Sequence, residues 1–395
     1  MTTKPFGVVP AGAKQQPTPF ELCIDEGKLQ DFKTLLKLSP IAKETYENLQ
    51  TNGEFGVSRK WVSDTKDYWL KEFDWRKEEN HINSFPNFKS QVSDTDGGKF
   101  DIHFAALFSS NPSAIPIAFF HGWPGSFLEF LPLMDILRNK YTSETLPYHV
   151  IAPSLPGFGL SSDPPHTKNW TTEDSARIMH KLLLSFGFGA TGYLVQGGDI
   201  GSFISRDMAV RYPECKGMHV NFMQTGNIKS KSDPADELSD MEKEGVKKLD
   251  EFNTVGNGYA KMHATKPSTI GLVLASSPLA QLAWIGEKFL VWTDPTTTPP
   301  LSTILADITL YWLSECYPTS IYTYRETQEA KFVDKPIGYS YFRFELAPVP
   351  RAWAEKTGNM VFFRSHENGG HFAALERPDV LLADVEDYVK VAWKS

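Results

Sequence analysis

The chain has 395 residues, of which 41% are hydrophobic, 22% are charged and 13% are aromatic. This is the composition of a globular, loop-rich protein, and it excludes fibrous, collagen-like and disordered classes. The 40 basic and 48 acidic residues give a net charge of −8 at pH 7, so the sequence favours neither a nucleic-acid partner nor an anionic membrane surface.

The first 16 residues contain no apolar stretch of the kind that a signal peptide requires. Their only charged side chains are Lys4 and Lys14, which stand among Gly, Pro and Ala. We therefore expect a cytoplasmic protein without a membrane anchor at this end.

The first hundred residues are rich in aromatic side chains that alternate with charged ones, as in the run from Tyr68 to Lys77. Such large rings lack long apolar partners of their own, which favours packing onto another surface over forming a separate core. We expect residues 1–105 to wrap around the rest of the molecule.

From Phe100 onward, short apolar runs alternate with helix-compatible segments. This alternation predicts an α/β fold with a mostly parallel central sheet flanked by helices, and with its glycine-rich loops at one edge of the sheet. The expected strands are Ile115–Phe120, Tyr148–Ala152, Gly192–Val195 and Met218–Phe222, and the expected helices between them are Ser126–Lys140 and Thr171–Phe186.

The alternation then stops, and strand character returns only at Gly338–Phe342 and Met360–Phe363. Ser239 and Glu242 form a capping box that opens a helix, and further helical segments follow. The simplest organisation is a core interrupted by a helical cap. We expect the core at 106–228 and 330–395 and the cap at 229–329.

One stretch within the expected cap, Pro267–Gly286, carries no charge and is long enough to cross a bilayer. Five polar side chains dilute it, and Pro278 breaks it in the middle. We therefore predict two short buried helices here rather than a transmembrane segment.

The most specific local pattern is Gly197-Gly198-Asp199-Ile200-Gly201, at the end of one expected strand and before a helix that starts near Ser202. It has the form of the nucleophile elbow, G-x-S-x-G, with Asp in the place of Ser. The helix dipole and free N–H groups stabilise a carboxylate there. The alternative is that Asp199 is an ordinary helix N-cap.

A second glycine-containing loop, His121-Gly122-Trp123-Pro124-Gly125, follows another expected strand. Its Trp123 N–H is able to pair with the N–H of Ile200 and form an oxyanion hole, although a simple Pro-Gly turn is the plainer interpretation. Near the carboxyl end, His371 follows Gly369-Gly370 in a loop after a strand. That place suits a general base, whereas a lone histidine is more often structural.

Together these motifs resemble the epoxide hydrolases of the α/β-hydrolase fold, in particular the microsomal type and its soluble fungal relatives. The resemblance implies that Asp199 is the nucleophile and His371 the base. It also implies that Glu345, in the run Phe344-Glu345-Leu346, is the acidic partner of the histidine, although some fungal relatives have Asp there. Asp334 is the local competitor for that role.

The same resemblance implies that two cap tyrosines hold the epoxide oxygen, and it assigns them to Tyr259 and Tyr324. A tyrosine keeps its proton at pH 7 and can give it to a stronger base. The residues alone do not single these two out, because three other tyrosines, Tyr311, Tyr317 and Tyr322, lie close by in the sequence.

The resemblance therefore implies hydrolysis of a small epoxide to a vicinal diol by water, without a cofactor, and a possible homodimer. An aspartate suits this chemistry because its attack on the epoxide forms an ester that water can cleave, whereas serine would form a stable ether. No metal site is expected, because Cys23, Cys215 and Cys316 are far apart.

Two alternatives remain open. A haloalkane dehalogenase shares the fold and the aspartate, but that family typically has Trp directly after the nucleophile, where this chain has Ile200. An inactive hydrolase-fold protein that serves as a binding module is the other.

Overall fold

The computed structural model describes residues 4–223, 238–326 and 330–394. The core–cap boundary expected between residues 228 and 229, and residue 329 at the expected end of the cap, lie outside this part of the chain.

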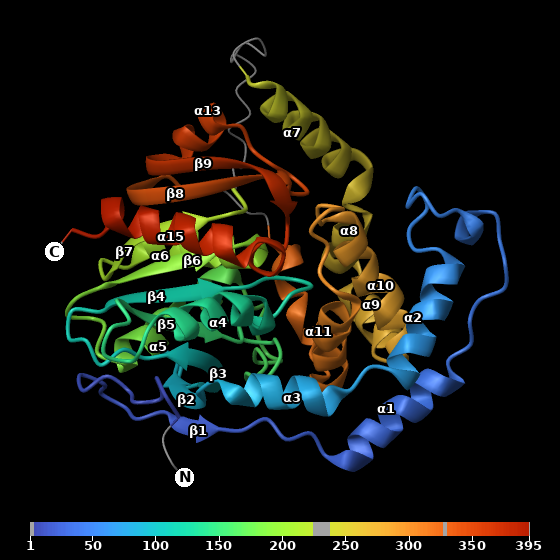
Figure 1. The fold of residues 1–395 in the computed structure, drawn as a ribbon, viewed down its shortest axis with the longest axis horizontal. Coiled ribbons are helices and arrows are strands. Elements are labelled where there is room, and N and C mark those ends of the chain that lie inside the picture. The colour runs from blue at the N-terminus through green and yellow to red at the C-terminus, as the bar shows by residue number, and fades with distance from the viewer. Residues whose placement is uncertain (1–3, 224–237, 327–329, 395) are drawn as a thin grey trace.

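Within the described residues, nine strands form one sheet in the order β1-β2-β3-β5-β4-β6-β7-β8-β9 (Figure 1). The pairs from β5 through β4 to β9 are parallel, and β1, β2 and β3 add antiparallel pairs at one edge. The mostly parallel sheet is therefore confirmed. The strands are β1 (Thr18–Phe20), β2 (Asn87–Ser93), β3 (Lys99–Leu107), β4 (Ile115–Phe120), β5 (Tyr148–Pro153), β6 (Tyr193–Gly197), β7 (Cys215–Val220), β8 (Val333–Phe344) and β9 (Gly358–Gly370).

Helices cover the sheet, with α4 packed beside α15 and α5 beside α6 (Figure 1). The helices in and around this core are α4 (Leu131–Lys140), α5 (Thr172–Ser185), α6 (Asp199–Arg211), α13 (Arg351–Ala354), α14 (Ala373–Glu376) and α15 (Pro378–Ala392). The helix expected over 126–140 is instead two pieces, the 3₁₀ turn η2 (Phe127–Phe130) and then α4. Pro132 at the start of α4 explains the break, because it has no N–H to continue the first piece. The expected start of α6 was also wrong, since α6 begins at Asp199.

The N-terminal segment lies along both the sheet and the cap (Figure 1). Its strands β1 and β2 extend the sheet, and its helices α1 (Glu26–Leu38), α2 (Arg59–Lys71) and α3 (Trp75–Ser84) contact cap helices. A buried hydrogen bond of 3.0 Å from Trp69 Nε1 to Thr309 Oγ1 joins α2 to the cap. Trp69, Trp75, Phe85 and Phe88 of this segment are buried, whereas Tyr46 and Phe55 are exposed.

The cap is helical, as expected, and lies beside the carboxyl ends of the parallel strands (Figure 1). The Ser239–Glu242 capping box is confirmed at the start of α7. The cap helices are α7 (Asp240–Glu251), α8 (Gly258–Thr265), α9 (Pro267–Leu274), α10 (Pro278–Val291), α11 (Leu301–Ser314) and α12 (Tyr317–Ser320). Among the described helices none alone has the length and apolar character to cross a membrane, and the pair α9 and α10, which meets that test only jointly, is bent by 116°.

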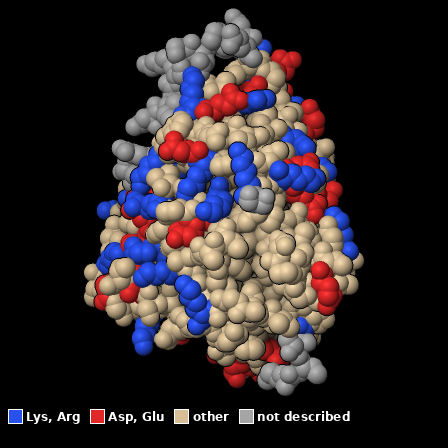
Figure 2. Space-filling model, turned by 90° about the vertical axis from the view of Figure 1, so that its left-hand side faces the viewer, with Lys and Arg blue, Asp and Glu red and all other residues tan. Residues whose placement is uncertain are grey.

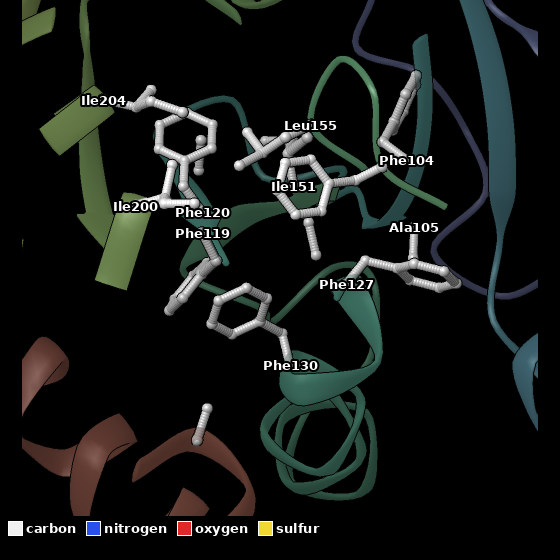
Figure 3. Close-up of a cluster of buried hydrophobic side chains, with 14 of the residues drawn as sticks. Phe104, Ala105, Phe119, Phe120, Phe127, Phe130, Ile151, Leu155, Ile200 and Ile204 are labelled. Atoms are coloured by element: carbon white, nitrogen blue, oxygen red, sulfur yellow. The ribbon is translucent and has the colours of Figure 1, made fainter. Parts of the chain in front are cut away.

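A cluster of buried side chains lies beneath the loops at the strand ends (Figure 3). Phe119 and Phe120 of β4 pack there with Ile200 and Ile204 of α6, and η2 adds its two phenylalanines. Interiors of this density resist displacement, so the cluster fixes the start of α6 relative to the end of β4. On the outer face in Figure 2, basic and acidic side chains are mixed in the upper part, and the lower centre carries few charges.

Candidate active site

Asp199 lies at the sharp turn between β6 and α6, and its φ of +45° is in the left-handed region. Non-glycine residues seldom adopt that conformation, which is a strained one that clusters at functional sites. The turn is tight because Gly201 packs on β4, where a β-carbon would collide with the carbonyl of Phe120. The structure therefore has the elbow geometry that the glycine pattern predicts, and it presents the Asp199 carboxylate at the end of the sheet.

The loop after β4 reaches the Asp199 carboxylate directly. The backbone N–H of Trp123 donates to Asp199 Oδ1 over 2.8 Å. Gly122 lets the two segments approach, because a β-carbon there would collide with Asp199 Oδ1 and lie 2.6 Å from Ile200 N. Gly122 thus lies in close contact with both Asp199 and the backbone nitrogen of Ile200. His121 is buried beneath them, and burial lowers its pKa to about 4, which keeps this ring neutral.

His371 lies between two carboxylates. Its Nε2 is 3.3 Å from Asp199 Oδ2, and its Nδ1 is 2.6 Å from Glu345 Oε1. Burial lowers the pKa of His371, but the charges of Glu345 and Asp199 outweigh burial and raise this pKa to about 10. Asp334, the sequence competitor, is exposed at the start of β8, whereas Glu345 is buried directly after that strand. The geometry therefore pairs Glu345, and not Asp334, with the histidine.

A loop at the end of α10 holds the His371 segment in place. The backbone N–H of His371 donates to the carbonyl of Trp292 over 2.9 Å, and the N–H of Gly369 donates to Asp294 Oδ2 over 2.9 Å. Glu376 Oε2 in turn accepts the N–H of Asp294 at 2.8 Å. These contacts join residues about 80 positions apart, and no local pattern in the sequence indicated them.

Tyr259 of α8 and Tyr324 of the short turn η5 (Tyr322–Arg325) are in contact with each other. Their ring centroids are 5.7 Å apart, and the ring planes are inclined by 79° in an edge-to-face contact. Trp123 stacks on the Tyr259 ring with a centroid distance of 5.3 Å. Burial raises the pKa of both phenols, and the charge of Asp199 raises both further, which places them within electrostatic reach of that carboxylate.

The three neighbouring tyrosines have partners of other kinds. Tyr311 donates its hydroxyl to the carbonyl of Gly125 over 2.8 Å. The Tyr317 hydroxyl lies 2.9 Å from His263 Nε2, and the Tyr322 hydroxyl lies 2.6 Å from Ser175 Oγ. Their hydroxyls are therefore engaged in packing the cap and the loops, which the sequence alone did not reveal.

A buried acidic group on α11 supports the Trp123 loop and was missed by the sequence reasoning. Asp307 accepts a hydrogen bond of 2.5 Å from Ser126 Oγ, and burial raises the pKa of Asp307 to about 7. The sequence does contain a signal for this residue, because Asp307 is the single charged residue of the apolar helix Leu301–Ser314. Over the described ranges, no group of three or more His, Cys, Asp or Glu side chains is arranged to hold a metal ion.

Comparison with known proteins identifies the family. Residues 17–130 match the family described as "Epoxide hydrolase N terminus", and residues 115–293 match the α/β hydrolase fold family. The solved structure of Aspergillus niger epoxide hydrolase is 47% identical, covers 99% of this chain and 100% of its own, and superposes with a TM-score of 0.94.

More distant relatives agree over most of the chain. "Epoxide hydrolase 1" of Oryctolagus cuniculus is 30% identical over 85% of this chain and 81% of its own length. The crystal structure of juvenile hormone epoxide hydrolase from the silkworm Bombyx mori is 27% identical, with a TM-score of 0.79 over 96% of this chain and 94% of its own. This family acts on small epoxides with water, which decides between the alternatives left open by the sequence. The chain therefore belongs to the epoxide hydrolase family, and its activity is the hydrolysis of epoxides.

Proposed function

We propose that the enzyme converts an epoxide to a vicinal diol in two half-reactions, through an ester formed on Asp199. The observation that carries this proposal is the line of contacts from the Trp123 N–H to Asp199, then to His371 and to Glu345, at 2.8, 3.3 and 2.6 Å. A carboxylate nucleophile, a base and an acidic partner in this order are what covalent ester catalysis requires.

In the first half-reaction, an Asp199 oxygen attacks one epoxide carbon. The electron pair of the breaking carbon–oxygen bond passes to the epoxide oxygen, which receives a proton from Tyr259 or Tyr324. Both phenols keep their protons at neutral pH because burial raises their pKa. Two donors converging on one oxygen stabilise the charge that develops as the ring opens.

The ester changes the state of His371. With both carboxylates charged, its pKa is about 10 and the ring is an imidazolium. Esterification removes the charge of Asp199, so the pKa of His371 falls and its proton is released to the tyrosinate left by ring opening. The neutral imidazole needed as a base thus forms only after the substrate is attached.

In the second half-reaction, His371 removes a proton from water, and the hydroxide attacks the ester carbonyl. The N–H groups of Trp123 and Ile200 stabilise the oxyanion, and one such donor is typically worth about 10²- to 10³-fold in rate. Collapse breaks the bond to the diol oxygen, which takes the proton from His371. The proton of the new Asp199 carboxyl then passes to His371 and restores the imidazolium.

The test is a variant that completes only the first half-reaction. His371→Gln is expected to consume one equivalent of epoxide and to accumulate a protein heavier by the mass of the epoxide, detected by intact mass spectrometry. Peptide mapping is expected to locate that mass on Asp199. Asp199→Asn is the matched control and is expected to stay unmodified. A folded His371→Gln variant that never carries the added mass would contradict the proposal.

A further inference from the structure

Lys288, in the last turn of α10, is a buried lysine whose ammonium group lies among aromatic rings. The residue is 5% exposed, and its Nζ lies 4.7 Å from the ring centroid of Tyr259. The same Nζ lies 5.6 Å from the centroid of Trp292 and 5.7 Å from that of Trp284. Lysine side chains usually carry their ammonium groups to water, so this placement needs a physical reason.

The surroundings of Lys288 stabilise its charged form. Its Nζ lies 2.6 Å from Glu287 Oε1, and three aromatic faces lie within the range of cation–π attraction. Burial lowers the pKa of Lys288, and the Glu287 carboxylate opposes that shift. A buried charge is tolerated where it is paired in this way. The ammonium form is therefore held above the Tyr259 ring.

Tyr259 is a weak acid in its surroundings. Burial raises the pKa of the phenol, and the negative charge of Asp199 raises it further. A cation over the ring acts in the opposite sense, because the negative charge of a phenolate is shared between its oxygen and its ring. At an effective protein dielectric of about 20 and a separation of about 5 Å, this attraction corresponds to a factor of roughly 10² in an ionisation equilibrium.

We propose that Lys288 is a positioning residue that makes Tyr259 a stronger proton donor by holding an ammonium group over its ring. This inference rests on the proposed role of Tyr259 in ring opening. It predicts that the charge at position 288 affects the formation of the Asp199 ester and not its hydrolysis, because Tyr259 gives up its proton only in the first half-reaction. α8 and α10, which carry the two residues, both pack against α9 in the cap, and the Lys288–Tyr259 contact joins them (Figure 1).

A double-mutant cycle on the full-length enzyme tests this inference. Single turnovers with enzyme in excess give the rate of ester formation and the rate of ester hydrolysis separately. Lys288→Met is expected to slow ester formation by roughly tenfold, since only part of the charge develops in the transition state. Lys288→Arg, which keeps the charge, is expected to retain most of the rate. In a Tyr259→Phe background, Lys288→Met is expected to have no further effect.

The matched control is Lys140→Met. Lys140, the last residue of α4, also has its Nζ over a tyrosine ring, 5.0 Å from the centroid of Tyr141. It belongs to the core and contributes nothing to the catalytic site. If Lys288→Met slows ester formation equally in the wild-type and the Tyr259→Phe backgrounds, Lys288 has only a packing role and the inference is overturned. So would parallel slowing of ester hydrolysis, or no slowing at all. If Tyr259→Phe itself leaves ester formation unchanged, the proton-donor role of Tyr259 fails instead, which distinguishes the two proposals.

Discussion

Glu345→Gln removes one charge from the site and leaves the packing nearly unchanged. Glu345 is 1% exposed, accepts from His371 Nδ1 at 2.6 Å, and accepts the N–H of Leu346 at 2.6 Å. A glutamine offers the same oxygen to both donors without the charge. A hydrogen bond to a charged group contributes about 1.5–3 kcal/mol, and 1.4 kcal/mol is a factor of about ten, so ester hydrolysis is expected to slow roughly 10- to 100-fold.

Ester formation is expected to be unaffected by the same change, because Asp199 attacks without a base. Acid-quenched single turnovers, with protein-bound ester and free diol quantified by mass spectrometry, separate the two rates. Glu367→Gln, an exposed glutamate of β9, is the matched control. The reasoning is refuted if Glu345→Gln slows ester formation as much as hydrolysis, or if it leaves hydrolysis at the original rate.

Three further predictions concern the loops, the titration of the site and the N-terminal segment. Gly122→Ala is expected to slow ester formation by at least about 10²-fold with folding retained, because its β-carbon collides with Asp199; normal single-turnover rates would contradict this. The pKa of His371 is about 10 in the folded state against 6.5 ordinarily, so its charge stabilises the fold fully below pH 6.5 and ceases to do so as pH rises through 10. The unfolding free energy of the wild type relative to His371→Gln is therefore expected to fall over that interval by an amount on the order of 5 kcal/mol, as measured by urea titrations. A difference that stays constant with pH would count against this prediction. Trp69→Phe is expected to destabilise the protein by about 1 kcal/mol in the same assay, because it loses the buried bond to Thr309, whereas an unchanged urea midpoint would show that this bond contributes nothing.

The parts of the site that the sequence predicted are those with a local physical signature. The elbow at Asp199 and the loop at Trp123 need glycines where backbones nearly touch, so their patterns are readable without a fold. The parallel strands are apolar runs of strand length, and four of them were located within a few residues. Glu345, Tyr259 and Tyr324 came only through family resemblance.

The remainder depends on contacts between distant segments. The strands β1 to β3 lie in a stretch of mixed aromatic and polar residues, and their pairing is visible only once the sheet exists. The bond from Gly369 to Asp294 joins a core loop to the cap, and the placement of Lys288 over Tyr259 joins two helices of the cap. The sequence does not place either pair of segments side by side. Long-range packing, rather than local propensity, decides these features.

The origin of the oxygen in the product tests the ester on Asp199 most directly. In a single turnover with enzyme in excess in oxygen-18 water, we expect the first diol to be unlabelled, because its new oxygen comes from the aspartate. The label is expected in the Asp199 carboxylate, where peptide mass spectrometry detects it. Label in the first diol and none in Asp199 would show direct attack by water and contradict the covalent mechanism.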